Sequence, residues 1–215
     1  MKLLLENWRQ YLNEESTLEI PNWARDIKQR YDSVPKTRDT FRQYAAEIRD
    51  AYNQAADRAF LNDFVYIHFI RNPQWLKNFL EGGVDSSSDL STMGYPKGSD
   101  LQSVRTWADI GILIEGEVVL AGVQDLQTDL DKPSVRRQKG YKKYTGKPEA
   151  LVANAEDFKK SGAEYFHEAV VTNWKIVGIV LPKNTIPEQF EEIVQQTSLP
   201  IYDSKLQPIS RETPK

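Results

Sequence analysis

Apolar residues recur at spacings of three and four in two stretches of the N-terminal quarter, and this period predicts two amphipathic helices. The apolar face of the first, in MKLLLENWRQYLNEE, is formed by Leu4, Leu5, Trp8, Tyr11 and Leu12. The second begins near Asp39 or Thr40, either of which suits the N-cap. Its apolar face is formed by Phe41, Tyr44, Ala45, Ile48, Tyr52, Ala55 and Ala56. Between the helices, Pro21 and Pro35 interrupt residues 16–35, where we expect irregular structure.

The apolar period changes to two over residues 64–70, which predicts a strand with a histidine in its middle. One face of this strand is expected to carry Val65, Ile67 and Phe69, and the other Tyr66, His68 and Ile70. A short helix should follow, because Asn72 suits its cap, Pro73 its first position, and Gly82 or Gly83 its end. Residues 84–103 are polar, and we expect a long loop there, of the kind that is often functional or disordered.

Two later segments each predict a hairpin. Residues 107–123 carry apolar runs on both sides of Glu115-Gly116, and residues 168–182, EAVVTNWKIVGIVLP, carry them on both sides of residues 172–175. Helices are expected over residues 149–160 and 186–196, and a short strand over residues 199–203. Strands that arrive as antiparallel pairs between short helices indicate an α+β fold.

Composition and charge narrow the class of protein. At 215 residues, 40% of them hydrophobic, the chain is long enough for one domain with a substantial core. We expect this domain over residues 61–215, preceded by a helical arm over residues 1–60. The absence of cysteine excludes disulfides, thiolate zinc sites and a cysteine nucleophile. No apolar run approaches the roughly 20 residues that span a bilayer, so we expect no membrane partner. The N-terminus does not resemble a signal peptide, because its apolar patch is short and acids follow it closely. The absence of cysteine agrees with a cytoplasmic location but does not fix the compartment.

The formal net charge of −3 argues against a wholly nucleic-acid-binding protein, but residues 132–147 form a local basic segment that contains no acid. Its arginines and lysines are candidates for contact with a nucleic acid or an acidic protein: Arg136, Arg137, Lys142 and Lys143. The alternative is a solvated loop. The acids Asp109, Glu115 and Glu117 lack the Glu-x-Lys pattern of metal nucleases, and we expect no metal site.

Two residues, 100 positions apart, are candidates for chemistry. His68 lies within an apolar strand, and Glu168 stands at the head of the apolar run Ala169–Val171, where a rigid strand can position its carboxylate. Each also has a structural interpretation: a hydrogen-bonded core histidine and an exposed acid at a strand end.

The order of these motifs resembles the ADP-ribosyltransferase fold, in which a split antiparallel sheet clasps NAD. The first strand of that family carries a His or Arg, often in a pattern such as YHFT, before a helix of the type LxxILxxG. Tyr66-Ile67-His68-Phe69 and residues 76–82, LKNFLEG, correspond to these two elements. A middle element that supplies Ser, Thr or Tyr corresponds to residues 91–95, STMGY. A late strand that begins with Glu, as in EVVV before N-x-x-I-x-G-I, corresponds to Glu168, Ala169, Val170, Val171, Asn173, Ile176, Gly178 and Ile179.

The resemblance implies an NAD-dependent transferase that moves ADP-ribose to a host macromolecule. Glu168 would stabilise the positive charge that develops on the ribose as the nicotinamide bond breaks. His68 would orient NAD through a ribose hydroxyl. Further cofactor contacts are expected from Ser91, Thr92 and Tyr95, with Tyr95 stacked on the nicotinamide and Arg105 on the pyrophosphate. The hypothesis requires His68 and Glu168 to converge on one gap of dinucleotide size.

The N-terminal segment resembles the short leaders of proteins packed inside the heads of T4-like tailed phages. Those leaders are removed after a Leu-x-Glu pattern, which Leu4-Leu5-Glu6 and Leu12-Asn13-Glu14 both fit, so residues 1–14 are a candidate processed leader. This resemblance implies a phage protein, packaged in the virion or acting in the host cytoplasm, whose first helix contacts head proteins. The alternatives are a helix that docks on its own domain, a virion protein of the same fold without the chemistry, and a nucleic-acid-binding module. Ile70 and Phe166, where the family often has polar or acidic residues, favour the virion protein.

Overall fold

A computed structural model describes residues 22–35, 37–56, 58–104, 106–122 and 167–210. The helices are α2 (Asn22–Asp32), α3 (Arg38–Ala55), α4 (Pro73–Leu80) and α8 (Glu191–Gln196), with 3-10 turns η1 (Arg58–Asp63) and η3 (Glu188–Phe190). The strands are β1 (Phe64–Phe69), β2 (Leu90–Pro96), β3 (Gly111–Gly122), β4 (His167–Val180), β5 (Ile201–Tyr202) and β6 (Pro208–Ile209). None of the helices in these ranges is both long and apolar enough to cross a membrane.

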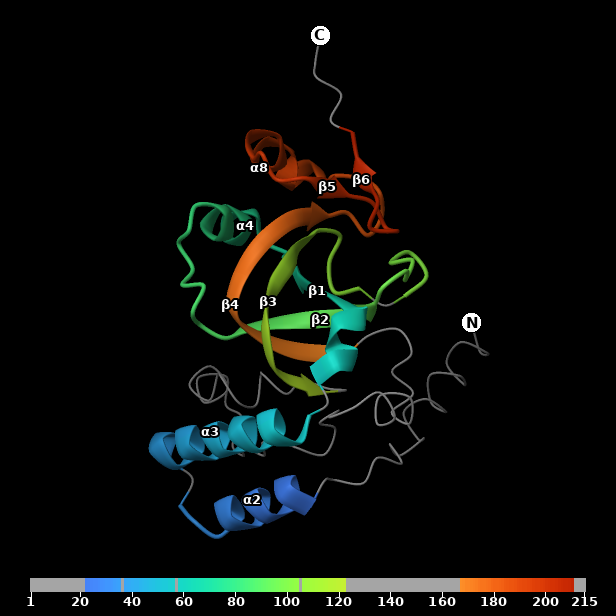
Figure 1. Cartoon of the computed structure of the whole chain (residues 1–215). Coiled ribbons are helices and arrows are strands. Elements are labelled where there is room, and N and C mark those ends of the chain that lie inside the picture. The colour runs from blue at the N-terminus through green and yellow to red at the C-terminus, as the bar shows by residue number, and fades with distance from the viewer. Residues whose placement is uncertain (1–21, 36, 57, 105, 123–166, 211–215) are drawn as a thin grey trace, which may run out of the picture.

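The described strands form one six-stranded sheet in the order β2-β1-β3-β4-β5-β6. β1 pairs antiparallel with β2 and β3, and β4 pairs antiparallel with β3 and, through its first half, with β2. Because β2 pairs with both β1 and β4, the first four strands close into a small ring. The two long strands of this ring, β3 and β4, are strongly curved (Figure 1). β5 is parallel to β4, so the sheet is of mixed orientation, whereas the family resemblance implies a split antiparallel sheet. The α+β class is confirmed.

The predicted hairpins at residues 107–123 and 168–182 are wrong, because each segment forms one long strand, β3 or β4. The two strands pair with each other, and the ladder shifts register between Glu115 and Glu117. Gly116 therefore lies opposite Asn173 and Trp174 in a β-bulge, where Asn173 has a φ of 48°. A Cβ at Gly116 would lie 2.9 Å from the Cα of Trp174, so the close approach requires glycine. Both sequence signals for a turn belong to this single bulge.

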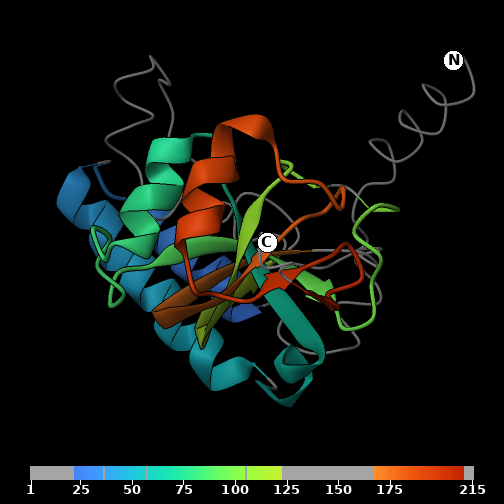
Figure 2. The same ribbon diagram turned by 90° about the horizontal axis from the view of Figure 1, so that it is seen from above.

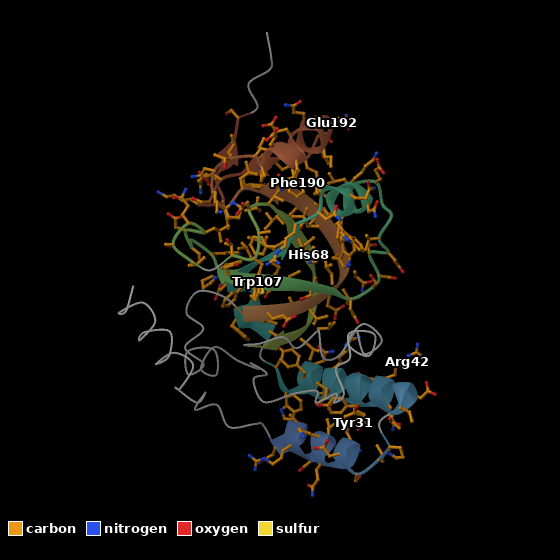
Figure 3. The ribbon with its side chains drawn as sticks, turned by 180° about the vertical axis from the view of Figure 1, so that it is seen from behind. Tyr31, Arg42, His68, Trp107, Phe190 and Glu192 are labelled. Carbon is orange, nitrogen blue, oxygen red and sulfur yellow. The ribbon has the colours of Figure 1, made fainter. Side chains whose placement is uncertain are left out.

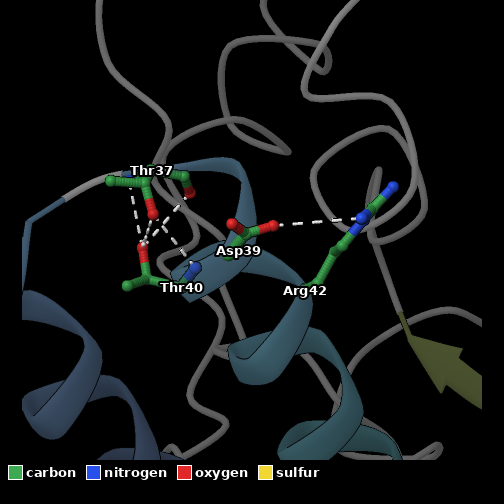
Figure 4. A network of polar contacts seen from close by, with 4 residues as sticks. All are labelled: Thr37, Asp39, Thr40 and Arg42. Atoms are coloured by element: carbon green, nitrogen blue, oxygen red, sulfur yellow. Dashed lines mark hydrogen bonds and ion pairs between the residues drawn. The ribbon is translucent and has the colours of Figure 1, made fainter.

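Helix caps set where the helices begin. The Thr37 hydroxyl accepts from the backbone N–H of Thr40 (3.2 Å), and the Thr40 hydroxyl accepts from the N–H of Thr37 (2.9 Å), which is a capping box (Figure 4). The cap of α3 is thus Thr37, and the expectation of Asp39 or Thr40 is wrong by two or three residues. Asn72 caps α4 as predicted, since its side chain accepts from the N–H of Gln74 (2.9 Å).

Two predicted irregular segments contain regular structure. α2 lies within residues 16–35, and its buried face, Ala24, Ile27 and Tyr31, has helical spacing. Pro21 and Pro35 stand outside its two ends, so they bound the helix and do not interrupt it. β2 lies within residues 84–103, where the adjacent Ser91 and Thr92 concealed the strand pattern. The predicted helices at residues 1–15 and 149–160 lie outside the described residues.

The buried side chains form two clusters on opposite faces of β1. The larger joins the sheet to α2, α3, α4 and α8, so the described part of the predicted arm packs on the sheet. α2 and α3 stack beneath the sheet, with Tyr31 on Tyr44 at a ring distance of 4.3 Å (Figure 3). α4 and α8 lie side by side at the other end (Figure 2). The smaller cluster contains Ile67, whereas Tyr66 belongs to the larger, which confirms the predicted alternation.

Candidate functional site

His68 lies in the middle of the molecule, half-buried on β1 (Figure 3). Its Nδ1 lies 2.6 Å from the backbone carbonyl oxygen of Ser91 on β2. A carbonyl oxygen only accepts hydrogen bonds, so Nδ1 must carry the proton and donate it. The ring of Phe79, from α4, packs on the imidazole with a centroid distance of 5.1 Å and an interplanar angle of 50°. The imidazole is therefore held both by a hydrogen bond and by a ring contact.

The position of His68 coincides with the end of a ladder. The pairing of β1 with β2 runs from Phe64 only as far as Ile67, which lies opposite Met93. His68 and Phe69 continue to pair with β3, on the other edge of β1. Beyond the last backbone pair, Ile67 and Met93, the hydrogen bond from the His68 imidazole to the Ser91 carbonyl therefore connects β1 to β2.

Glu168, the second residue of β4, is 5% exposed. Its Oε1 accepts a hydrogen bond of 2.7 Å from the Ser91 hydroxyl. A buried carboxylate is costly unless hydrogen bonds replace its water, and bonds to a charged group are the stronger ones. The strand pairing places Glu168 opposite Met93 on β2 and Gly122 on β3, so strands fix its backbone on both sides.

Ser91 connects the two candidate residues, which project to opposite faces of the sheet. Ile67 lies opposite Met93, and Met93 lies opposite Glu168, so these three side chains share a face. His68 follows Ile67 along β1 and therefore projects to the other face. The Ser91 carbonyl accepts a hydrogen bond from Nδ1–H of His68, and the Ser91 hydroxyl donates a hydrogen bond to Glu168 Oε1. The site is a chain of contacts through one serine, in which the histidine and the carboxylate do not face each other. The convergence of both side chains on one gap, which the sequence-based hypothesis requires, is therefore not what this strand pairing gives.

The loop between α4 and β2 is attached to the bulge of β4 by three hydrogen bonds. Trp174 donates from its backbone N–H to the carbonyl of Ser86 (3.0 Å) and from its indole Nε1–H to the carbonyl of Ser88 (2.9 Å). Between them, the Thr172 hydroxyl donates to the carbonyl of Ser87 (2.9 Å). The loop therefore reaches Ser91 from a fixed starting point.

Charged side chains support the same loop at its two ends. The backbone N–H of Ser87, and then its hydroxyl, donate to the Asp85 carboxylate and hold the pKa of Asp85 below its ordinary value, against a small opposing effect of burial. At the other end Asp89 forms an ion pair with Arg49 of α3. Among the residues that the structure describes, no cluster of three or more His, Asp or Glu side chains is arranged to hold a metal ion.

The other predicted contact residues have different positions. Thr92 is 2% exposed, and its hydroxyl donates to the carbonyl of Ala169 (2.9 Å), so it joins β2 to β4. Tyr95 is completely buried and meets Phe69 edge-on at a ring distance of 6.2 Å. A ring without exposed surface has no face for a ligand, so we correct the expected role of Tyr95 and assign it to the core.

Several predicted residues lie outside the described ranges. They are Arg105, the basic segment 132–147 with Arg136, Arg137, Lys142 and Lys143, and the candidate leader 1–14. Their proposed contacts with NAD, an acceptor and head proteins stay predictions.

The sequence did not indicate two further aromatic residues of the site, Phe79, which packs on His68, and Trp174, which packs on Phe79. Phe79 packs on Trp174 at a centroid distance of 5.6 Å. Both occur in the segments that carry the family resemblance, but apolar residues there predict only a helix face and a strand face. Trp174 lies at the bulge beside Asn173, which no local pattern revealed.

The chain matches no protein-family model, no curated protein and no solved structure. Its function must therefore be argued from its own side chains.

Proposed function

We propose that this protein transfers ADP-ribose from NAD to a host macromolecule, with Glu168 as the residue that stabilises the transition state. The observation that carries the proposal is the 2.7 Å hydrogen bond from the Ser91 hydroxyl to Glu168 Oε1. A carboxylate that is fixed by a neighbouring hydroxyl and by strands on both sides is oriented before substrate binds. Preorganised charge of this kind stabilises a developing cation without further rearrangement.

The chemistry requires one bond to break and one to form. The bond between ribose C1′ and the nicotinamide nitrogen breaks, its electron pair leaves with nicotinamide, and positive charge develops on the ribose. The Glu168 carboxylate, bonded to a ribose hydroxyl, stabilises that charge more in the transition state than in the ground state. A nucleophile of the acceptor then bonds to C1′ and loses its proton. His68 contributes by positioning NAD.

The positions of His68 and Glu168 restrict where NAD can bind. Because His68 and Glu168 project to opposite faces, NAD that contacts both must pass the end of the β1–β2 ladder beside Ser91. That is the level at which Ile67–Met93 is the last backbone pair. The proposal therefore predicts that NAD lies across this edge, with its nicotinamide ribose on the side of Glu168.

The test is to incubate the purified full-length protein with NAD labelled in the adenylate part and with a bacterial host lysate. Nicotinamide release and label transfer to lysate macromolecules are measured together. We expect both for the unchanged chain and a loss of at least about 100-fold for Glu168→Gln, which keeps the shape but not the charge.

The matched control is Glu191→Gln, the same change at an exposed acid of α8. It should leave both readings unchanged. Absence of nicotinamide release from the unchanged chain, or full activity of Glu168→Gln, contradicts the proposal.

A second candidate is a virion protein that has this fold without the chemistry. Two observations favour it: Glu168 is only 5% exposed, and His68 projects to the opposite face. This candidate predicts no heat of NAD binding in calorimetry and co-purification of the protein with phage heads. Measurable NAD binding that Glu168→Gln weakens contradicts it.

A further inference from the structure

We propose that Trp174 is the positioning residue of this site, because its contacts lead both to His68, through Phe79, and to Ser91, through the loop before β2. It is 5% exposed and lies at the β4 bulge, where Gly116 allows the neighbouring strand to approach. The motifs of the family resemblance give Trp174 no role. Its effect on catalysis rests on the proposed function, whereas its effect on the geometry of His68 and Ser91 does not.

The first contact acts on His68 through a row of three rings. The rings of Trp174 and Phe79 lie 5.6 Å apart at 56°, and those of Phe79 and His68 lie 5.1 Å apart at 50°. Tilted rings at these separations attract each other through the edge of one and the face of the next. Trp174 thus packs on Phe79, and Phe79 packs on the imidazole whose Nδ1 donates to the Ser91 carbonyl, so the indole restricts the imidazole through Phe79.

The second contact acts on Ser91 through the backbone. The indole Nε1–H of Trp174 donates to the carbonyl of Ser88, three residues before Ser91, and its own backbone N–H donates to Ser86. A loop that is tied three residues upstream restricts where β2 begins. The hydroxyl of Ser91 is then delivered to Glu168 Oε1 at 2.7 Å.

The two contacts use different parts of the indole, so substitutions can separate them. Trp174→Phe keeps an aromatic ring against Phe79 and removes the Nε1–H. Trp174→Leu removes both. Trp75 on α4 is 56% exposed, and Trp75→Leu is the matched control for replacing a tryptophan elsewhere in the chain.

The first readout is the tautomer of His68, measured by long-range ¹⁵N–¹H NMR of the full chain at about pH 8, where an ordinary imidazole is neutral. The chain has two histidines, and His167→Gln assigns the signals of the other. We expect the pattern of a protonated Nδ1 in the unchanged chain, in Trp174→Phe and in Trp75→Leu. Trp174→Leu should lose this pattern and give averaged signals of both tautomers.

The second readout is the backbone amide signal of Ser91, which should shift in Trp174→Phe and in Trp174→Leu but not in Trp75→Leu. An unchanged His68 pattern in folded Trp174→Leu, or an unmoved Ser91 amide in Trp174→Phe, overturns the proposal. If Trp174→Leu does not fold, Phe79→Leu takes its place for His68, and an unchanged tautomer pattern there overturns the proposal equally.

The third readout depends on the proposed function. If the unchanged chain releases nicotinamide from NAD, Trp174→Phe should lower kcat about tenfold with little change in KM, because the lost hydrogen bond acts on the orientation of Ser91 and Glu168. An unchanged kcat overturns the positioning role. If the unchanged chain has no activity, the proposed function fails, and the two NMR readouts still decide whether Trp174 positions His68 and Ser91.

Discussion

The hydrogen bond between Ser91 and Glu168 should be among the stronger single interactions of the fold, and a double-mutant cycle measures it. Glu168 is 5% exposed, and the Ser91 hydroxyl lies 2.7 Å from its Oε1. A hydrogen bond to a charged group contributes about 1.5–3 kcal/mol, and removal of one partner leaves the other to bear its cost of burial. Ser91→Ala should therefore lower the free energy of unfolding by about 1.5–3 kcal/mol.

The cycle combines Ser91→Ala with Glu168→Met, which is similar in shape to glutamate and carries no charge. Replacing both partners by apolar groups removes the unsatisfied atoms as well as the bond, so the double variant should be more stable than the sum of the single changes indicates. We expect a coupling free energy of about 1.5–3 kcal/mol at pH 7. The assay is unfolding in urea, with comparison of midpoints at an unchanged slope.

The matched control replaces Ser91→Ala by Ser99→Ala, another half-buried serine, whose hydroxyl donates to the carbonyl of Pro96 (2.7 Å) and not to Glu168. Combined with Glu168→Met, this change should be additive to within about 0.5 kcal/mol. A coupling below about 0.5 kcal/mol for Ser91 and Glu168 would refute the reasoning, because the two side chains would then contribute independently.

Three further predictions concern the fold around the site. Gly116→Ala should destabilise the protein by about 1–3 kcal/mol, because its Cβ would lie 2.6 Å from Val171 Cγ1. Gly98→Ala is the control for the strain of a positive φ (88°) alone, since nothing lies within 4 Å of a Cβ there. Equal losses of stability for the two variants in urea unfolding would contradict the packing argument. Thr37→Ala should cost about 1 kcal/mol through loss of the α3 cap and Thr37→Ser much less, and equal melting temperatures for the two variants would argue against the capping box. The pKa of Asp85 is depressed in the folded protein, so its contribution to stability is present above the unfolded-state pKa and is lost as the pH falls through the lower folded pKa. Ser87→Ala keeps the backbone N–H, which is the larger cause, and removes only the hydroxyl, so it should raise that pKa part of the way toward the ordinary value in an NMR titration; an unchanged titration would contradict the contribution of the hydroxyl.

The sequence alone determined the local structure wherever a single segment contains its own signal. The alternation over residues 64–70 predicted both faces of β1, and Asn72 and Pro73 predicted the start of α4. These predictions succeeded because a strand period and a helix cap depend on residues that are neighbours in the chain. The order of helices and strands then indicated the α+β class.

Pairing between distant segments was decided only by the tertiary structure. Gly116 and Asn173 are ordinary turn residues in the sequence, but across the β3–β4 ladder they form one bulge, so two predicted hairpins became two long strands. In β2, Ser91 and Thr92 concealed the strand because their hydroxyls bond to β4, and neither partner lies within 70 residues in the chain.

In the candidate site too, the residue types follow from the sequence, whereas their contacts follow from the tertiary structure. The sequence identified His68, Ser91 and Glu168 as residues of interest, but it could not indicate that Ser91 contacts both of the others, or that the others project to opposite faces. The face of Glu168 follows from the register of β4 against β2, and a shift of one residue would reverse it. That register is fixed by the packing of the whole ring of strands, which no single stretch of sequence contains.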